Sequence, residues 1–76
     1  MLEKNIRLGS IEQVKAFVNL AMAKDFDVDL YSDKYIVNGK SIMGIFSIDL
    51  TKPIKMVANC EENDVFATEI ESFICE

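Results

Sequence analysis

Few side chains in this 76-residue chain could do chemistry, and they do not combine into a catalytic group. The sequence contains no histidine, and no nucleophile has a base within plausible reach. It also has no glycine-rich phosphate loop. The two cysteines, Cys60 and Cys75, are too few for a disulfide scaffold and lack the spacing of zinc ligands, so we expect both to be reduced and buried. These observations predict a protein that is not an enzyme and holds no cofactor and no metal.

Four aspartates lie close together in the sequence and could suggest a calcium site: Asp25, Asp27, Asp29 and Asp33. Three of them alternate with apolar residues, which is typical of the solvated face of a strand, and the ligand spacing of an EF-hand is absent. The net charge of -5 argues against nucleic acid or an anionic membrane as a partner, because both are polyanions. Since no apolar run approaches about 18 residues and residues 1–9 do not have the form of a signal peptide, we expect a cytoplasmic protein.

The length and the hydrophobic pattern predict one α+β domain that covers residues 1–76. Alternation of apolar and polar residues predicts strands at residues 5–8, 25–31, 35–37 and 54–60. Helical spacing of apolar residues predicts helices over residues 11–24, from Ser41 to about Ser47, and with an apolar face between residues 65 and 74. The first helix should bury one apolar stripe: Val14, Phe17, Val18, Ala21 and Met22. The second helix has too many apolar residues for one buried stripe, so some of them must face solvent. The order β-α-β-β-α-β-α predicts a two-layer sandwich, in which an antiparallel four-stranded sheet carries its helices on one face.

Capping residues are expected at the starts of the helices. Ser10 to Gln13 has the form of a capping box, in which the Ser10 hydroxyl accepts from the Gln13 amide and the Gln13 side chain reaches back to the Ser10 amide. Ser41 is placed to cap the second helix, and Asn63 or Asp64 to cap the third.

One stretch resembles a known family. Asn38 to Leu50 reads N-G-K-S-I-M-G-I-F-S-I-D-L, which is similar to the N-x-K-S-I-M-G run and the short apolar helix of the histidine-containing phosphocarrier (HPr) family of the bacterial phosphotransferase system for sugar transport. From about Gln13 to Asn59 the chain follows the family pattern without a gap. The resemblance implies an HPr-like open-faced sandwich, which is the architecture that the element order predicts.

The resemblance also implies a regulatory site at Ser41. In the family the matching serine is phosphorylated by an HPr-type kinase, and a phosphate there would lie at a helix N-terminus beside Lys40, which would stabilise its charge. The alternative is that Ser41 acts only as a helix cap, which typically contributes about 1 kcal/mol of stability with or without a kinase.

Partner binding is the second function that the resemblance implies. The residues matching Ile42, Met43 and Phe46 form a docking patch for transferase and regulator proteins in the family, and Lys40 beside them is also expected to bind the partner. Two alternatives stay open: Ile45 and Ile48 are core while the other three are exposed without a role, or a second copy of the chain covers the patch. We expect protein partners, namely an HPr-type kinase, a transcriptional regulator or phosphotransferase components.

The family's active loop reads roughly G-I-H-A-R-P-A, whereas this chain has L-G-S-I-E-Q and a shorter connection after the first strand. Ser10 stands at or near the histidine position, and Glu12 stands near the arginine position, where a carboxylate repels phosphate. Without histidine, phosphohistidine relay is excluded by composition. The sequence therefore predicts an HPr-like regulatory protein-binding module without carrier activity. The alternative is an orphan structural or interaction domain that keeps only the fold.

Overall fold

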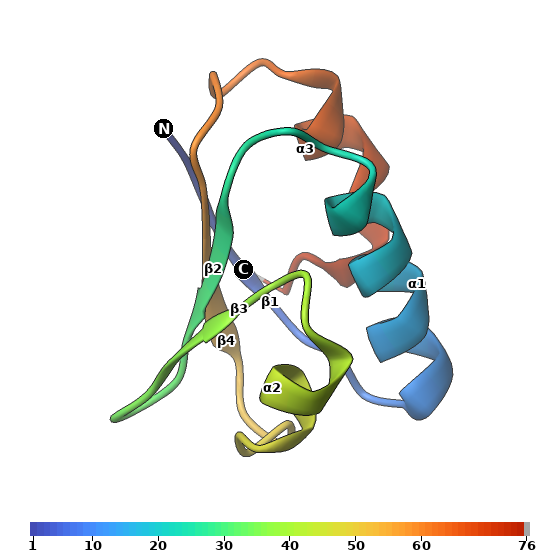
Figure 1. Ribbon diagram of the computed structural model, residues 1–76, viewed down its shortest axis with the longest axis vertical. Coiled ribbons are helices and arrows are strands. Elements are labelled where there is room, and N and C mark those ends of the chain that lie inside the picture. The colour runs from blue at the N-terminus through green and yellow to red at the C-terminus, as the bar shows by residue number, and fades with distance from the viewer. Residues whose placement is uncertain (76) are drawn as a thin grey trace.

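The computed structural model describes residues 1–75, in which one antiparallel sheet carries all helices on one face (Figure 1). The elements in chain order are β1 (Leu2–Ile6), α1 (Ile11–Met22), β2 (Val28–Tyr31), β3 (Ile36–Asn38), α2 (Ile42–Phe46), β4 (Ile54–Ala58), α3 (Val65–Glu69) and a short 3-10 helix, η1 (Glu71–Phe73). The strand order across the sheet is β1-β4-β2-β3, with every neighbouring pair antiparallel. The predicted α+β fold class and element order are confirmed.

Strand β1 begins and ends earlier than the sequence pattern predicts, because pairing with β4 sets its bounds. Ile6, the last residue of β1, pairs with Ile54, the first residue of β4. The next position of the partner is Pro53, which has no amide hydrogen to donate to a ladder. The Arg7 amide instead donates to the Phe73 carbonyl at 2.8 Å, so the chain after β1 turns toward η1.

Strand β2 is also shorter than predicted, because pairing with β4 sets the residue at which it begins. Its first residue, Val28, pairs with Ala58, which is the last residue of β4. Asp25 and Asp27 therefore precede the strand, whereas the sequence placed both in it. The inward alternation is as predicted within the strand, since Val28 and Leu30 are fully buried. β3 and β4 also differ from the predicted bounds, by one or two residues at their ends.

The helices end sooner than their apolar patterns indicate. α1 stops at Met22, whose side chain is exposed although the pattern placed it on the buried stripe. The last predicted helix divides into α3 and η1, and Val65 on α3 is exposed rather than part of the apolar face. The predicted burial is correct in the middle of α1, where Val14, Phe17 and Val18 are buried against the sheet.

An aromatic cluster joins the helices in the layer that covers the sheet. Phe17 of α1 packs edge to face on Phe73 of η1, with ring centroids 5.8 Å apart, and lies 6.4 Å from Phe66 of α3. Phe26, in the connection from α1 to β2, packs edge to face on Phe66 at 5.6 Å. Edge-to-face pairs of this kind add to the stability gained from burial. The cluster fixes α1, whose N-terminal turn lies at the candidate site.

Candidate functional site

Ser41 begins α2 and acts as its N-cap. The Ser41 backbone is extended, and its Oγ accepts a hydrogen bond from the Gly44 amide at 3.1 Å. This bond satisfies one of the free amides of the first helical turn, as predicted. At the other end of the helix, the Ser47 hydroxyl donates to the Gly44 carbonyl. Ser41 is half-buried, and the position of its hydroxyl at the helix N-terminus is fixed by this contact.

Helix α2 is only five residues long, and its apolar side chains divide between the core and the surface. Ile45 is fully buried, and Ile48 just after the helix is 7% exposed. Ile42, Met43 and Phe46 are 38%, 84% and 43% exposed. A single turn of helix cannot turn five apolar residues inward, so three of them remain in contact with solvent. We call these three residues the α2 patch.

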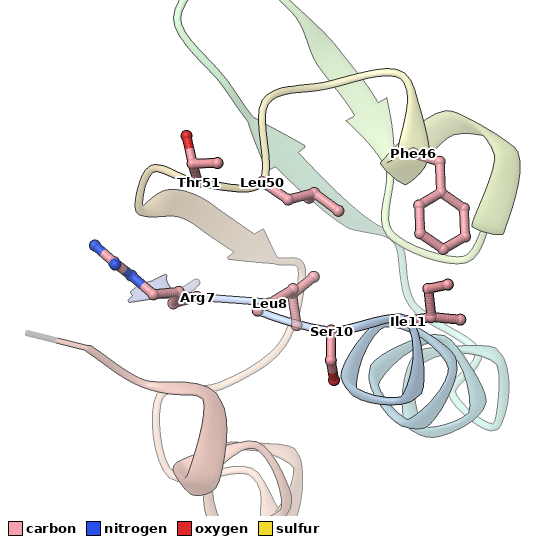
Figure 2. A pocket seen from close by; sticks show the side chains of 8 residues that line it. Arg7, Leu8, Ser10, Ile11, Phe46, Leu50 and Thr51 are labelled. Atoms are coloured by element: carbon pink, nitrogen blue, oxygen red, sulfur yellow. The ribbon is translucent and has the colours of Figure 1, made fainter.

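A hollow of about 380 Å³ lies beside the α2 patch, between α2 and the connection from β1 to α1 (Figure 2). Its lining is mostly apolar and consists of Arg7, Leu8, Gly9, Ser10, Ile11, Phe46, Leu50 and Thr51. Phe46 belongs to both the α2 patch and the hollow. The structure therefore places the loop that contains Ser10 next to the patch, although the two are more than 30 residues apart in the sequence.

The loop at Ser10 forms the cap of α1, with one difference from the predicted capping box. Ser10 Oγ accepts from the Gln13 amide at 3.1 Å, as predicted, but the Gln13 side chain accepts from the Gly9 amide at 2.6 Å rather than from Ser10. The Ser10 side chain points away from Phe46 and Leu50 (Figure 2). Glu12 is exposed in the first turn of α1 and does not line the hollow.

Lys40 lies next to Ser41 in the sequence, but its side chain points to another part of the fold. Its Nζ donates to the Lys24 carbonyl at 2.9 Å, just beyond the end of α1. Lys24 in turn forms an ion pair with Glu69 of α3 at 2.7 Å. The hydrogen bond that the Lys24 ammonium donates to the Glu69 carboxylate, opposed in part by desolvation, raises the pKa of Lys24 above its ordinary value. Both lysines thus connect the C-terminal end of α1 to other elements.

The cysteines differ from each other in exposure, which corrects the expectation that both are buried. Cys60 is half-buried, and burial together with the nearby Asp64 carboxylate raises the pKa of its thiol. Cys75 is exposed. Across residues 1–75, no three acidic or cysteine side chains are grouped so that they could hold a metal ion. None of the helices formed by these residues has the length and apolar character needed to cross a membrane.

The sequence predicted Ser10 and Phe46 as site residues, but not the other six residues that line the hollow: Arg7, Leu8, Gly9, Ile11, Leu50 and Thr51. The sequence offered one signal for these residues, namely an apolar residue, Ile11, at the first position of α1. In the structure the Ile11 side chain is 61% exposed. The other lining residues could not be predicted from the sequence, because they come together only where the connection after β1 packs against the segment after α2.

The fold defines an open-faced α+β sandwich with an exposed apolar patch on its second helix. No protein-family model matches the sequence, and no curated protein matches it. Among solved structures, the chain is similar to the crystal structure of HPr-C-His from Thermoanaerobacter tengcongensis, with 25% sequence identity and a TM-score of 0.73. The similarity covers 97% of this chain and 91% of that one. The chain thus has the HPr fold, and the fold that the resemblance implied is confirmed.

Proposed function

We propose that this protein is a regulatory protein-binding module of the HPr type that does not carry phosphohistidine. In this proposal the α2 patch docks a protein partner, and phosphorylation of Ser41 changes that docking. The observation that carries the proposal is the position of Ser41 at the start of the helix that also exposes Ile42, Met43 and Phe46. The chain contains no histidine that could accept phosphate, which supports binding in place of phosphoryl transfer.

A phosphate on Ser41 would change the surface beside the patch. The Ser41 hydroxyl that now accepts from the Gly44 amide would carry about -1.5 to -2 charges at neutral pH. Because the charge would lie at the N-terminus of α2, the helix would tolerate it. Ile42 and Met43 follow directly in the sequence, so a partner that covers them would meet the phosphate at the edge of its interface. Such a charge favours a partner with a basic group there and disfavours one without it.

Phosphorylation tests the first half of the proposal. The purified chain is incubated with an HPr-type kinase and ATP, and separately with phosphotransferase enzyme I and phosphoenolpyruvate, and is then analysed by intact mass and site mapping. We expect one phosphate from the kinase, located on Ser41, and none from enzyme I. A Ser47→Ala variant, which keeps Ser41 and its cap, should be phosphorylated like the wild type. A chain that the kinase leaves unmodified, or that accepts phosphate from enzyme I, would contradict the proposal.

Docking tests the second half, and the chain offers a matched pair of variants. Met43 and Met22 are both exposed methionines on helices, at 84% and 62%, but only Met43 belongs to the α2 patch. Partners captured on the wild type are compared with those captured on Met43→Glu and Met22→Glu. We expect Met43→Glu to lose a partner that Met22→Glu retains, with both variants folded by circular dichroism. Equal capture by the two variants would exclude the α2 patch as the docking surface.

A second candidate function has its own supporting observation. The Ser41 hydroxyl is already used as a helix cap, so its presence is explained without a kinase. In that case the chain is an interaction or structural domain that keeps the HPr fold alone. Ser41→Asp and Ser41→Ala separate the two functions, because aspartate keeps the helix cap and adds a negative charge, alanine removes the cap and adds no charge, and neither offers a hydroxyl to a serine kinase. Unchanged behaviour of Ser41→Asp and Ser41→Ala in partner capture would favour this second function.

A further inference from the structure

The single arginine of the chain, Arg7, lies at one end of the hollow, and the apolar side chains of Ile11 and Phe46 lie at the other end (Figure 2). Arg7 is exposed. Among residues 1–75, the ion pairs link Lys24 with Glu69, Lys52 with Asp33 and Lys55 with Glu3, and none of them includes Arg7. An arginine guanidinium is well suited to hold a carboxylate through two parallel hydrogen bonds. The end of the hollow at Arg7 can therefore receive an anionic group.

Several other polar groups of the lining have partners within the chain. Ser10 Oγ accepts from the Gln13 amide, and the Thr51 hydroxyl donates to Asp49. The backbone amides of Arg7 and Gly9 donate to Phe73 and to the Gln13 side chain. None of the lining residues belongs to a strand, so the hollow has no sheet edge that a partner strand could extend, whereas a helix brings its own hydrogen bonds complete. The lining thus suits the side chains of a helix better than the backbone of a strand.

We propose that the hollow receives one apolar side chain from an amphipathic helix of a partner protein, while an acidic residue of that helix, one turn away, pairs with Arg7. The inference rests on the proposed docking function and specifies the partner's chemistry. A protein segment is favoured over a small carboxylate ligand because the apolar surface continues from Phe46 to Ile42 and Met43 on α2. A small ligand in the hollow would leave both of those side chains in water. Residues three or four positions apart on a helix share one face, which fixes the spacing of the two groups.

Selection of peptides on the full chain tests this inference. A displayed library of helical peptides about 15–20 residues long is selected on the wild type, Arg7→Glu, Met43→Glu and a control, Lys34→Glu. Lys34→Glu makes the same change in charge at an exposed residue between β2 and β3, away from the hollow. On the wild type and Lys34→Glu, we expect peptides with an apolar residue and an Asp or Glu three or four positions apart. The affinity of these peptides should fall roughly three- to tenfold on Arg7→Glu.

The outcomes separate this inference from the proposed function. Peptides that need Met43 but show no acidic preference, and that bind Arg7→Glu as well as the wild type, would overturn the inference and leave the docking function in place. If no peptide is selected on the wild type while native partners still distinguish Met43→Glu from Met22→Glu, the inference also fails. Sodium octanoate is titrated in parallel by amide NMR. Shifts at Leu8, Ile11 and Leu50 from octanoate, without peptide binding, would assign the hollow to small carboxylates and overturn the inference.

Discussion

Replacement of Lys40 by methionine separates two roles that this residue could have. The resemblance assigns Lys40 to the docking surface next to Ser41, but its Nζ donates to the Lys24 carbonyl at 2.9 Å in a partly buried position. The last carbonyls of a helix have no partner within the helix, and a cation near them is favoured by the helix dipole. α1 has no basic residue in its own last turn. We therefore expect the Lys40 ammonium to stabilise the end of α1 from a distant point in the sequence.

The magnitude follows from that contact. A hydrogen bond from a charged group contributes about 1.5–3 kcal/mol, and a cation near a helix C-terminus about 0.3–1 kcal/mol when exposed. Because Lys40 is only partly buried, we expect Lys40→Met to lower the free energy of unfolding by about 1–2 kcal/mol. For a domain of this size, each 1 kcal/mol corresponds to a decrease in Tm of about 4–8 °C. Methionine keeps the apolar stem, so loss of packing contributes little.

The assay is urea unfolding followed by circular dichroism, with Lys34→Met as the control. Lys34 is exposed in the connection between β2 and β3, and its replacement removes the same charge. Partner capture is measured on both variants. If Lys40→Met is as stable as Lys34→Met and instead loses the captured partner, the assignment of Lys40 to the end of α1 is wrong and its assignment to the docking surface is correct.

Two further predictions follow from local geometry. Gly39→Ala should lower the free energy of unfolding, measured by urea unfolding, by about 1–3 kcal/mol. The reason is that the added methyl would lie 2.8 Å from Val28 Cγ1 and 3.0 Å from the Val28 carbonyl oxygen. A variant as stable as the wild type would contradict this packing. Hydrogen bonds from the Thr51 hydroxyl and amide lower the pKa of Asp49, so NMR titration should show a higher Asp49 pKa in Thr51→Val. These hydrogen bonds stabilise the folded protein at pH values above the ordinary carboxyl pKa, and this stabilisation is lost as the pH falls through the folded-state pKa of Asp49. The difference in free energy of unfolding between the wild type and Thr51→Val should therefore vanish in acid. A difference that persists in acid would contradict the prediction.

The local features of the fold could be predicted from the sequence because each depends on residues close together in the chain. The caps at Ser10, Ser41 and Asp64 each use a side-chain oxygen and an amide two or three residues later. The alternation of apolar residues identified the inward faces of the strands, and helical spacing identified the buried face of α1. The predicted strand ends were wrong where pairing with a neighbouring strand sets them. Pro53, which directly precedes β4, has no amide hydrogen for the ladder, and β1 therefore ends at Ile6, opposite Ile54.

The candidate site also combines features that could be predicted from the sequence with features that depend on the tertiary structure. The sequence alone indicated that α2 is too apolar to bury all of its side chains, and it identified Ser41 as the residue that begins the helix. Only the tertiary structure brought Ser10 and Ile11 next to Phe46, and only it directed Lys40 to the end of α1. Contacts between residues this far apart depend on strand order and on how the helices pack over the sheet, and no local pattern encodes either of them.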